Sequence, residues 1–218
     1  MKYQGIIFDL DGTLVNSLDD LAISVNKVLT SYNLPTHNIE SYKYRVGNGI
    51  RKLMERSLPE DKQYLLDEAL DKFKVIYAKH NLDHTAPYVG ILDLLKELKA
   101  KNVKLGICTN KHDEAAKDIV KLLFGEGIFS EIIGDKVGLK RKPDPSKVLL
   151  IAKNWGLEPS QIVYLGDSDV DMQTAVNANM LAVGVLWGFR DAEELKNNGA
   201  DMLIDKPLDL LTNISFDE

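Results

Sequence analysis

Two aspartates at the end of an apolar segment are the residues of this sequence best suited to chemistry. The apolar run Ile6–Phe8 is followed directly by the segment Asp9–Thr13, which reads Asp-Leu-Asp-Gly-Thr. Residues two apart in an extended backbone project to the same side, so the carboxylates of Asp9 and Asp11 would lie close together. Such a pair repels unless one member is protonated or a cation lies between them. The pair suits a cation-assisted nucleophile, Asp9, beside an acid or base, Asp11; the simpler alternative is an acidic turn after a strand.

Length and composition restrict the class of protein. The 218 residues provide for one large domain or a domain with an insert. A net charge of −6 gives no basic surface for nucleic acid. No apolar run approaches the length of a membrane span, and the first strand begins too early to leave space for a signal peptide. Cys108 is the only cysteine, which excludes an intrachain disulfide and favours a reducing compartment. We therefore expect a cytoplasmic protein, monomeric or homodimeric, without nucleic-acid or membrane partners.

Residues from about 15 to about 82 show helical periodicity and no strand pattern. Apolar residues recur at helical spacing from Leu18 to Leu29, and again over residues 50–58 and 65–77. Ser17, followed three residues later by Asp20, resembles a capping box at the start of the first helix. This segment is expected to be an all-helical insert.

Strands and helices alternate from about residue 87 onward. Short apolar strands are expected at residues 103–108, 131–133, 162–165, 181–185 and 202–204, with helices at residues 91–98, 115–123 and 148–155. Alternation of this kind implies a parallel sheet with helices on both faces. The predicted fold class is α/β, a doubly wound, Rossmann-like parallel sheet formed by residues 1–14 and 83–218 that carries a helical domain at residues 15–82.

Three of the expected strands end in polar residues. Asp9 and Asp11 follow the first strand, Thr109 and Asn110 follow the next, and Asp167 follows a later one. Ligands of doubly wound sheets bind beyond the carboxyl ends of the strands, near the switch in strand order, so we expect the three ends to meet at one site. The hydroxyl, amide and backbone N–H groups of Thr109 and Asn110, just before a helix, suit an anion, although they would equally serve as a helix N-cap.

Charged side chains in two later loops complete this expected site. Lys142 precedes the stiff segment Pro143–Pro145, which would hold its ammonium over the site. There it would neutralise a phosphate and keep Asp9 ionised. Asp167 is a candidate ligand for Mg²⁺, which prefers hard oxygen atoms, and Asp171, one helical turn later, is expected to support the ligands. The alternatives are a solvated basic loop and an acidic helix start that complements the helix dipole.

The order of these motifs resembles that of the haloacid dehalogenase superfamily of phosphotransferases. The order is Asp-x-Asp-Gly-Thr, Thr-Asn, Lys-Pro and Gly-Asp-x-x-x-Asp, and it spans residues 9–171. The resemblance implies a phosphatase in which Asp9 attacks phosphorus, while Asp11 protonates the leaving group and then activates water against the aspartyl-phosphate. It also implies Mg²⁺ held by Asp9, the backbone carbonyl of Asp11 and Asp167, and a phosphate bound by Thr109, Asn110 and Lys142.

The helical segment resembles the four-helix cap of the first cap class of this superfamily. Arg45, Gly47 and Asn48, within an Arg-Val-Gly-Asn-Gly segment, resemble the cap loop of phosphoglycolate phosphatases. We expect them to set substrate specificity; a plain turn beside a surface arginine is the alternative. The expected reaction is hydrolysis of a small phosphorylated metabolite, with 2-phosphoglycolate the best candidate. A β-phosphoglucomutase-like phosphomutase, a pyrophosphatase or nucleotidase of the same superfamily, and an inactive binding module are the alternatives.

Overall fold

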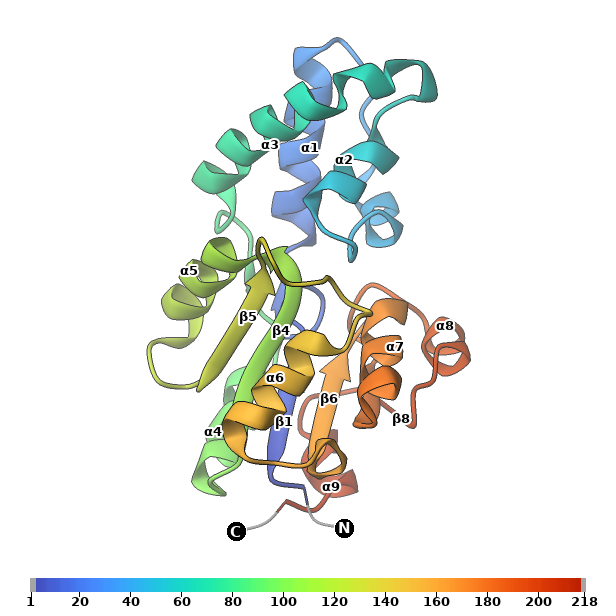
Figure 1. The fold of residues 1–218 in the computed structure, drawn as a ribbon. Helices are drawn as coiled ribbons and strands as arrows, with labels where there is room; N and C mark the ends of the chain where they lie inside the picture. Colours follow the sequence, from blue (N-terminus) through green and yellow to red (C-terminus); the bar gives the residue numbers. More distant parts are fainter. Residues whose placement is uncertain (1–2, 217–218) are drawn as a thin grey trace.

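The computed structural model, which describes residues 3–216, contains a parallel β-sheet with helices on both faces (Figure 1). Within these residues the sheet has six strands, in the spatial order β5-β4-β1-β6-β7-β8. In chain order they are β1 (Gly5–Phe8), β4 (Lys104–His112), β5 (Glu131–Asp135), β6 (Ile162–Gly166), β7 (Leu181–Val185) and β8 (Met202–Ile204). All neighbouring strands are parallel, which confirms the predicted doubly wound α/β fold.

Two hydrophobic clusters bury the two faces of the sheet. Successive residues of β1 alternate between them: Ile6 and Phe8 belong to the first cluster and Ile7 to the second, as the two-residue period of a strand requires. The first face is covered by α4 (Ile91–Ala100), α5 (Asp113–Phe124) and α9 (Asp209–Asn213). The second is covered by α6 (Ser146–Trp155), α7 (Asp169–Ala178) and α8 (Ala192–Asn197), and a short 3₁₀ helix, η3 (Pro159–Gln161), leads into β6. Burial on both faces explains why these strands read as continuous apolar runs.

A second group of helices lies beyond the carboxyl ends of the strands, at the top of Figure 1. In chain order these are α1 (Leu18–Ser31), η1 (Ile39–Tyr44), α2 (Ile50–Ser57), η2 (Glu60–Leu65) and α3 (Leu66–His80). Their apolar faces pack into a cluster of their own, in which Val25, Met54 and Phe73 are buried. The predicted helical periodicity of this segment is therefore confirmed. Within residues 3–216 no helix has both the length and the apolar character needed to span a bilayer.

Two short strands connect the helical segment to the sheet. β2 (Val15–Asn16) pairs in antiparallel fashion with β3 (Ala86–Pro87), so the outgoing and returning connections run side by side. The prediction of no strand between residues 15 and 82 is wrong at β2. A strand of two residues is too short to show an alternating pattern, so the sequence could not reveal it.

The start of α1 differs from the predicted capping box. Ser17 occupies the N-cap position, but its hydroxyl donates to Asp11 Oδ1 over 2.6 Å instead of capping the helix. The Asp20 carboxylate accepts hydrogen bonds from the backbone N–H groups of His84 and Thr85. The capping prediction is wrong because both side chains find partners outside the helix, one at the strand end and one in the returning connection.

Candidate active site

The three polar strand ends lie on three adjacent strands, β4, β1 and β6. Asp9 directly follows β1, and its N–H donates to Leu165 O of β6 over 2.9 Å. Asp167 directly follows β6. The chain leaves β5 on one side of β1 and returns in β6 on the other side, so the strand order switches at this point. The structure therefore places the predicted groups where ligands of doubly wound sheets bind.

A buried lysine joins two of the carboxylates at this edge of the sheet. The Lys142 ammonium lies 2.9 Å from Asp9 Oδ1 and 2.6 Å from Asp171 Oδ1, and its side chain is fully buried. It also donates to the Tyr164 hydroxyl over 3.1 Å. Burial lowers the pKa of the ammonium, but the charges of Asp171 and Asp9 outweigh burial and raise this pKa above its usual value. Lys142 is therefore a fixed positive charge beside Asp9.

Asp167 is fixed from two directions. The Thr13 hydroxyl donates to its Oδ1 over 3.0 Å, and the Phe189 N–H donates to its Oδ2 over 2.9 Å. Gly12 makes the close approach possible, because a Cβ at this position would lie 2.2 Å from Asp167 Oδ2. The φ of Gly12 is +86°, which also favours glycine. The Gly-Thr pair after the two aspartates is thus explained by the position of Asp167.

Three buried carboxylates, those of Asp9, Asp167 and Asp171, form the candidate metal site, each offering an oxygen within 4.8 Å of the others. Asp171 uses its oxygens on Lys142 and on Ser168, which starts α7. Asp9 Oδ1, although close to Lys142, accepts no well-directed hydrogen bond from the described residues. Burial, with the charge of Asp171, raises the pKa of Asp9 to about 6 and that of Asp167 well above its usual value. A hard dication would satisfy Asp9 and Asp167 and relieve their repulsion, so the residues present fit Mg²⁺.

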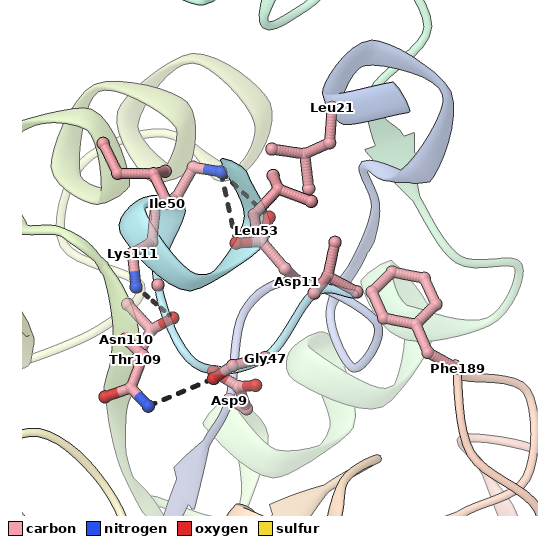
Figure 2. Close-up of a pocket in the computed structure, with 12 residues that line it drawn as sticks. Asp9, Asp11, Leu21, Gly47, Ile50, Leu53, Thr109, Asn110, Lys111 and Phe189 are labelled. Carbon is pink, nitrogen blue, oxygen red and sulfur yellow. Dashed lines mark hydrogen bonds and ion pairs between the residues drawn. The ribbon is translucent and has the colours of Figure 1, made fainter. Parts of the chain in front are cut away.

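A pocket lies between the strand ends and the helical segment, with a cavity volume of about 50 Å³ (Figure 2). Polar residues of the sheet form its floor: Asp9, Asp11, Thr109, Asn110 and Lys111. The helical segment forms its roof with Leu21, Val46, Gly47, Gly49, Ile50 and Leu53, and Phe189 closes it from the sheet side. A ligand in this pocket would therefore contact both the sheet and the helical segment.

Thr109 and Asn110 lie within β4 and not at a helix start. β4 continues to His112 and α5 begins at Asp113. The prediction that this strand ends at residue 108 is wrong because the apolar pattern stops there, whereas pairing with β5 resumes at His112 after a shift in register. The alternative of a helix N-cap for Thr109 and Asn110 is excluded by this placement.

Asn110 links the lysine loop to the helical segment. Its side-chain oxygen accepts a hydrogen bond from the backbone N–H of Lys142 over 3.0 Å, and its amide group donates to Gly47 O over 3.1 Å. Figure 2 shows the contact between Asn110 and Gly47. The structure thus brings Asn110, Lys142 and Gly47 together, as the predicted site requires.

The other two predicted cap residues lie elsewhere. Arg45 and Asn48 are not among the described residues that line the pocket. The Arg45 guanidinium donates to Ser41 O over 2.7 Å, and Asn48 accepts a hydrogen bond from Arg56 over 2.7 Å. Both side chains therefore support the helical segment in this arrangement.

Lys111 is a pocket residue to which the sequence analysis assigns no role, although the segment Thr109–Lys111 resembles that of phosphoglycolate phosphatases. Its ammonium lies 3.0 Å from Asp11 Oδ1 and donates to the Tyr77 hydroxyl oxygen of α3 over 2.7 Å. Figure 2 shows its pairing with Asp11. Residues two apart in a strand point to the same side, so a strand predicted as far as residue 112 would have placed Lys111 beside Thr109 at the site.

Comparison with known proteins gives concordant matches. A family model for haloacid dehalogenase-like hydrolases matches residues 6–185. A phosphoglycolate phosphatase from Aquifex aeolicus (strain VF5) is 32% identical over 206 residues, which cover 94% of this chain and 94% of that protein. One from Psychrobacter arcticus is 34% identical over 204 residues, covering 90% and 89%. The crystal structure of a candidate phosphoglycolate phosphatase from Lactobacillus delbrueckii subsp. bulgaricus has a TM-score of 0.91 and 33% identity, covering 96% of this chain and 97% of that one.

Proposed function

The chain belongs to the haloacid dehalogenase-like hydrolase family, as its motifs predicted, and we propose that it is a Mg²⁺-dependent hydrolase of small phosphomonoesters. The observation that carries the proposal is the position of Asp9. Its carboxylate lines the pocket, lies 2.9 Å from the Lys142 ammonium and shares an acidic site with Asp167. A carboxylate nucleophile must be ionised and must reach its substrate. Lys142 favours the ionised form, and the pocket supplies the access.

In this proposal Asp9 is the nucleophile and Asp11 is the acid and base. Asp9 forms a bond to phosphorus as the ester bond breaks, and Asp11 donates a proton to the leaving oxygen. Asp11 then takes a proton from the water that hydrolyses the aspartyl-phosphate. Asp9, Asp167 and the backbone carbonyl of Asp11 would hold Mg²⁺, which when bound supplies positive charge opposite the phosphoryl oxygens. Lys142 remains beneath Asp9, and Thr109 and Asn110 bind the phosphate.

We infer that residues 15–82 act as a cap on a core formed by residues 1–14 and 83–218. The roof of the pocket comes from this segment, and Arg190 of the core donates to Val46 O in it over 3.1 Å. Closure over the strand ends would exclude water while Asp9 attacks phosphorus. An opening of the cap would then admit the substrate.

2-Phosphoglycolate is the proposed substrate. The Aquifex and Psychrobacter relatives are named for this activity and align with nine-tenths or more of the chain. A phosphomutase of the β-phosphoglucomutase type would instead need to bind a hexose phosphate. The activity for which these relatives are named therefore favours hydrolysis of a smaller ester.

The test is phosphate release from 2-phosphoglycolate by the purified chain, with Mg²⁺ and with a chelator. We expect activity only with Mg²⁺, and a loss of at least about 10³-fold in kcat for Asp9→Asn, since removal of a nucleophile abolishes its whole pathway. Asp19→Asn is the matched control, because Asp19 is an exposed carboxylate in the first turn of α1. Full activity of Asp9→Asn, or release that the chelator leaves unchanged, contradicts the proposal. An isomeric sugar phosphate formed from a hexose phosphate would instead favour the phosphomutase.

A further inference from the structure

The pocket exposes one cation to a ligand. Among the described residues that line it, the charged side chains are Asp9, Asp11 and Lys111. The Lys142 ammonium is fully buried beneath the pocket and committed to two carboxylates. The Arg45 guanidinium is bound to backbone within the helical segment. A negative charge on the leaving part of a substrate would therefore find its counter-charge at Lys111.

Lys111 is part of the pocket wall and does not reach in from the surface. It is 7% exposed, and its ammonium lies 3.0 and 3.2 Å from the two carboxylate oxygens of Asp11. The Tyr77 hydroxyl accepts its hydrogen bond over 2.7 Å, and the ammonium lies 4.8 Å from the centre of the Tyr77 ring. An ammonium has three donors, and the two oxygens of one carboxylate can share one of them. When Asp11 shares one donor in this way, one is left for a ligand.

The position of Lys111 also suits recognition of the leaving group. Asp11, which pairs with Lys111, is the proposed proton donor to the leaving oxygen. The Asp11 carboxyl and the leaving oxygen must therefore come within about 3 Å of each other during the reaction. A charged group one carbon away from that oxygen would lie beside the Lys111 ammonium. The remaining lining near this end is apolar, with Leu21, Ile50 and Leu53. An anion placed against those side chains would lose its hydration without gaining a partner.

We propose that Lys111 is the residue that selects the substrate, by binding a carboxylate adjacent to the scissile phosphate ester. This inference rests on the proposed phosphatase function and assigns recognition of the carboxylate to β4, while the cap loop that contains Arg45 supplies only shape. Lys111 and Ile50 also border a larger cleft of about 510 Å³ between α3 and α5. The same two side chains therefore separate the pocket from that cleft and limit the length of the leaving group.

The experiment compares two esters of similar size that differ in charge, 2-phosphoglycolate and 2-hydroxyethyl phosphate. Their kcat/KM values are measured for the unmodified chain, for Lys111→Met and Lys111→Arg, and for the control Lys121→Met, whose lysine is 66% exposed on α5. A charge-assisted hydrogen bond corresponds to a preference of about 10- to 100-fold for the carboxylate ester. We expect Lys111→Met to remove this preference, Lys111→Arg to keep part of it, and Lys121→Met to keep all of it.

A second measurement needs no variant and so does not depend on folding of Lys111→Met. Glycolate and ethylene glycol are compared as inhibitors of 2-hydroxyethyl phosphate hydrolysis by the unmodified chain, and we expect glycolate to inhibit at a concentration at least about 10-fold lower. Equal inhibition, or an equal loss on both esters in Lys111→Met, overturns the proposal. Preferential hydrolysis of pyrophosphate overturns the assignment of a carboxylate. If neither ester is hydrolysed, the proposed phosphatase function fails; if both are hydrolysed without preference, only this inference fails.

Discussion

The floor and the roof of the pocket are held in place in different ways. The floor is built on adjacent strands of one sheet. Buried ion pairs and hydrogen bonds of 3.0 Å or less fix it, such as the ion pair of Lys142 with Asp9 and the hydrogen bond of Thr13 with Asp167. The roof belongs to a helical segment with its own hydrophobic cluster. It contacts the floor through separate polar links, such as those from Asn110 to Gly47 O and from Lys111 to Tyr77. This difference supports the proposal of a fixed reaction site beneath a movable cap.

Removal of the Lys142 charge from the floor is expected to have the largest effect on stability and activity. Lys142→Met leaves the buried carboxylates of Asp9 and Asp171 without their cation, and loss of one partner from a buried ion pair costs about 3–5 kcal/mol. We expect urea denaturation without Mg²⁺ to show a decrease of this size in the free energy of unfolding. Phosphate release should fall to background, because the Asp9 carboxylate loses the charge that keeps it ionised.

Lys147→Met is the matched control for this prediction. Lys147 is also completely buried, but its ammonium donates to a backbone carbonyl, Thr109 O, over 2.8 Å and pairs with no carboxylate of the described residues. Burial lowers the pKa of this ammonium. Loss of one such hydrogen bond, whose donor is charged, corresponds to about 1.5–3 kcal/mol. Equal destabilisation by the two substitutions would show that burial of a lysine, and not charge pairing with Asp9, is what the floor depends on.

The pH dependence of stability is expected to show an intermediate effect. The pKa of Asp9 is about 6 in the folded chain against an ordinary 3.8, so the folded state binds more protons between these values. Stability of the metal-free protein therefore falls as pH rises from about 4 to about 6, by up to about 3 kcal/mol for this group. Asp167 acts in the same direction. Mg²⁺ should reverse the trend, because it binds the ionised carboxylates and stabilises the folded state.

Thermal denaturation at pH 4.5 and pH 7, with and without Mg²⁺, measures this effect. Asp9→Asn removes one titrating group, so the fall in Tm between the two pH values should be smaller for this variant than for the unmodified chain. If, without metal, the Tm of both proteins changes to the same extent between these pH values, the raised pKa of Asp9 is not the cause of the pH dependence.

The floor could be predicted from the sequence because its residues follow apolar strands at fixed spacing. Asp9, Asp11 and Asp167 were located by the strands before them, and the parallel topology brought those strand ends together. The order of the strands could not be derived in the same way, since periodicity shows which face of a strand is buried and not which strand lies beside it. The end of β4 was misplaced for a related reason: its last residues are polar and continue the strand only through backbone pairing.

The roof was less predictable because its contacts join residues far apart in the chain. Helical periodicity identified α1, α2 and α3, but it gave no indication that Tyr77 would meet Lys111, 34 residues later. The cap loop illustrates the same limit. Of its three predicted residues, the structure brings Gly47 to the pocket, whereas the Arg45 side chain turns to Ser41 O. A motif locates a loop, but the packing around the loop decides which of its side chains face a ligand.

The smallest predicted effect concerns the link between roof and floor. Tyr77→Phe removes the oxygen that accepts a hydrogen bond from Lys111, while the ring can keep its stacking on Phe73, 5.2 Å away. A hydrogen bond to a charged group corresponds to about 1.5–3 kcal/mol. Because Lys111 keeps Asp11 as a partner, we expect the lower end of this range: a fall of about 10-fold in kcat/KM for 2-phosphoglycolate and a decrease of about 1.5 kcal/mol in the free energy of unfolding. Tyr64→Phe is the control, since Tyr64 is 77% exposed. A loss as large as that of Lys142→Met would mean that the roof is as firmly built into the site as the floor, and the distinction between a fixed site and a movable cover would fail.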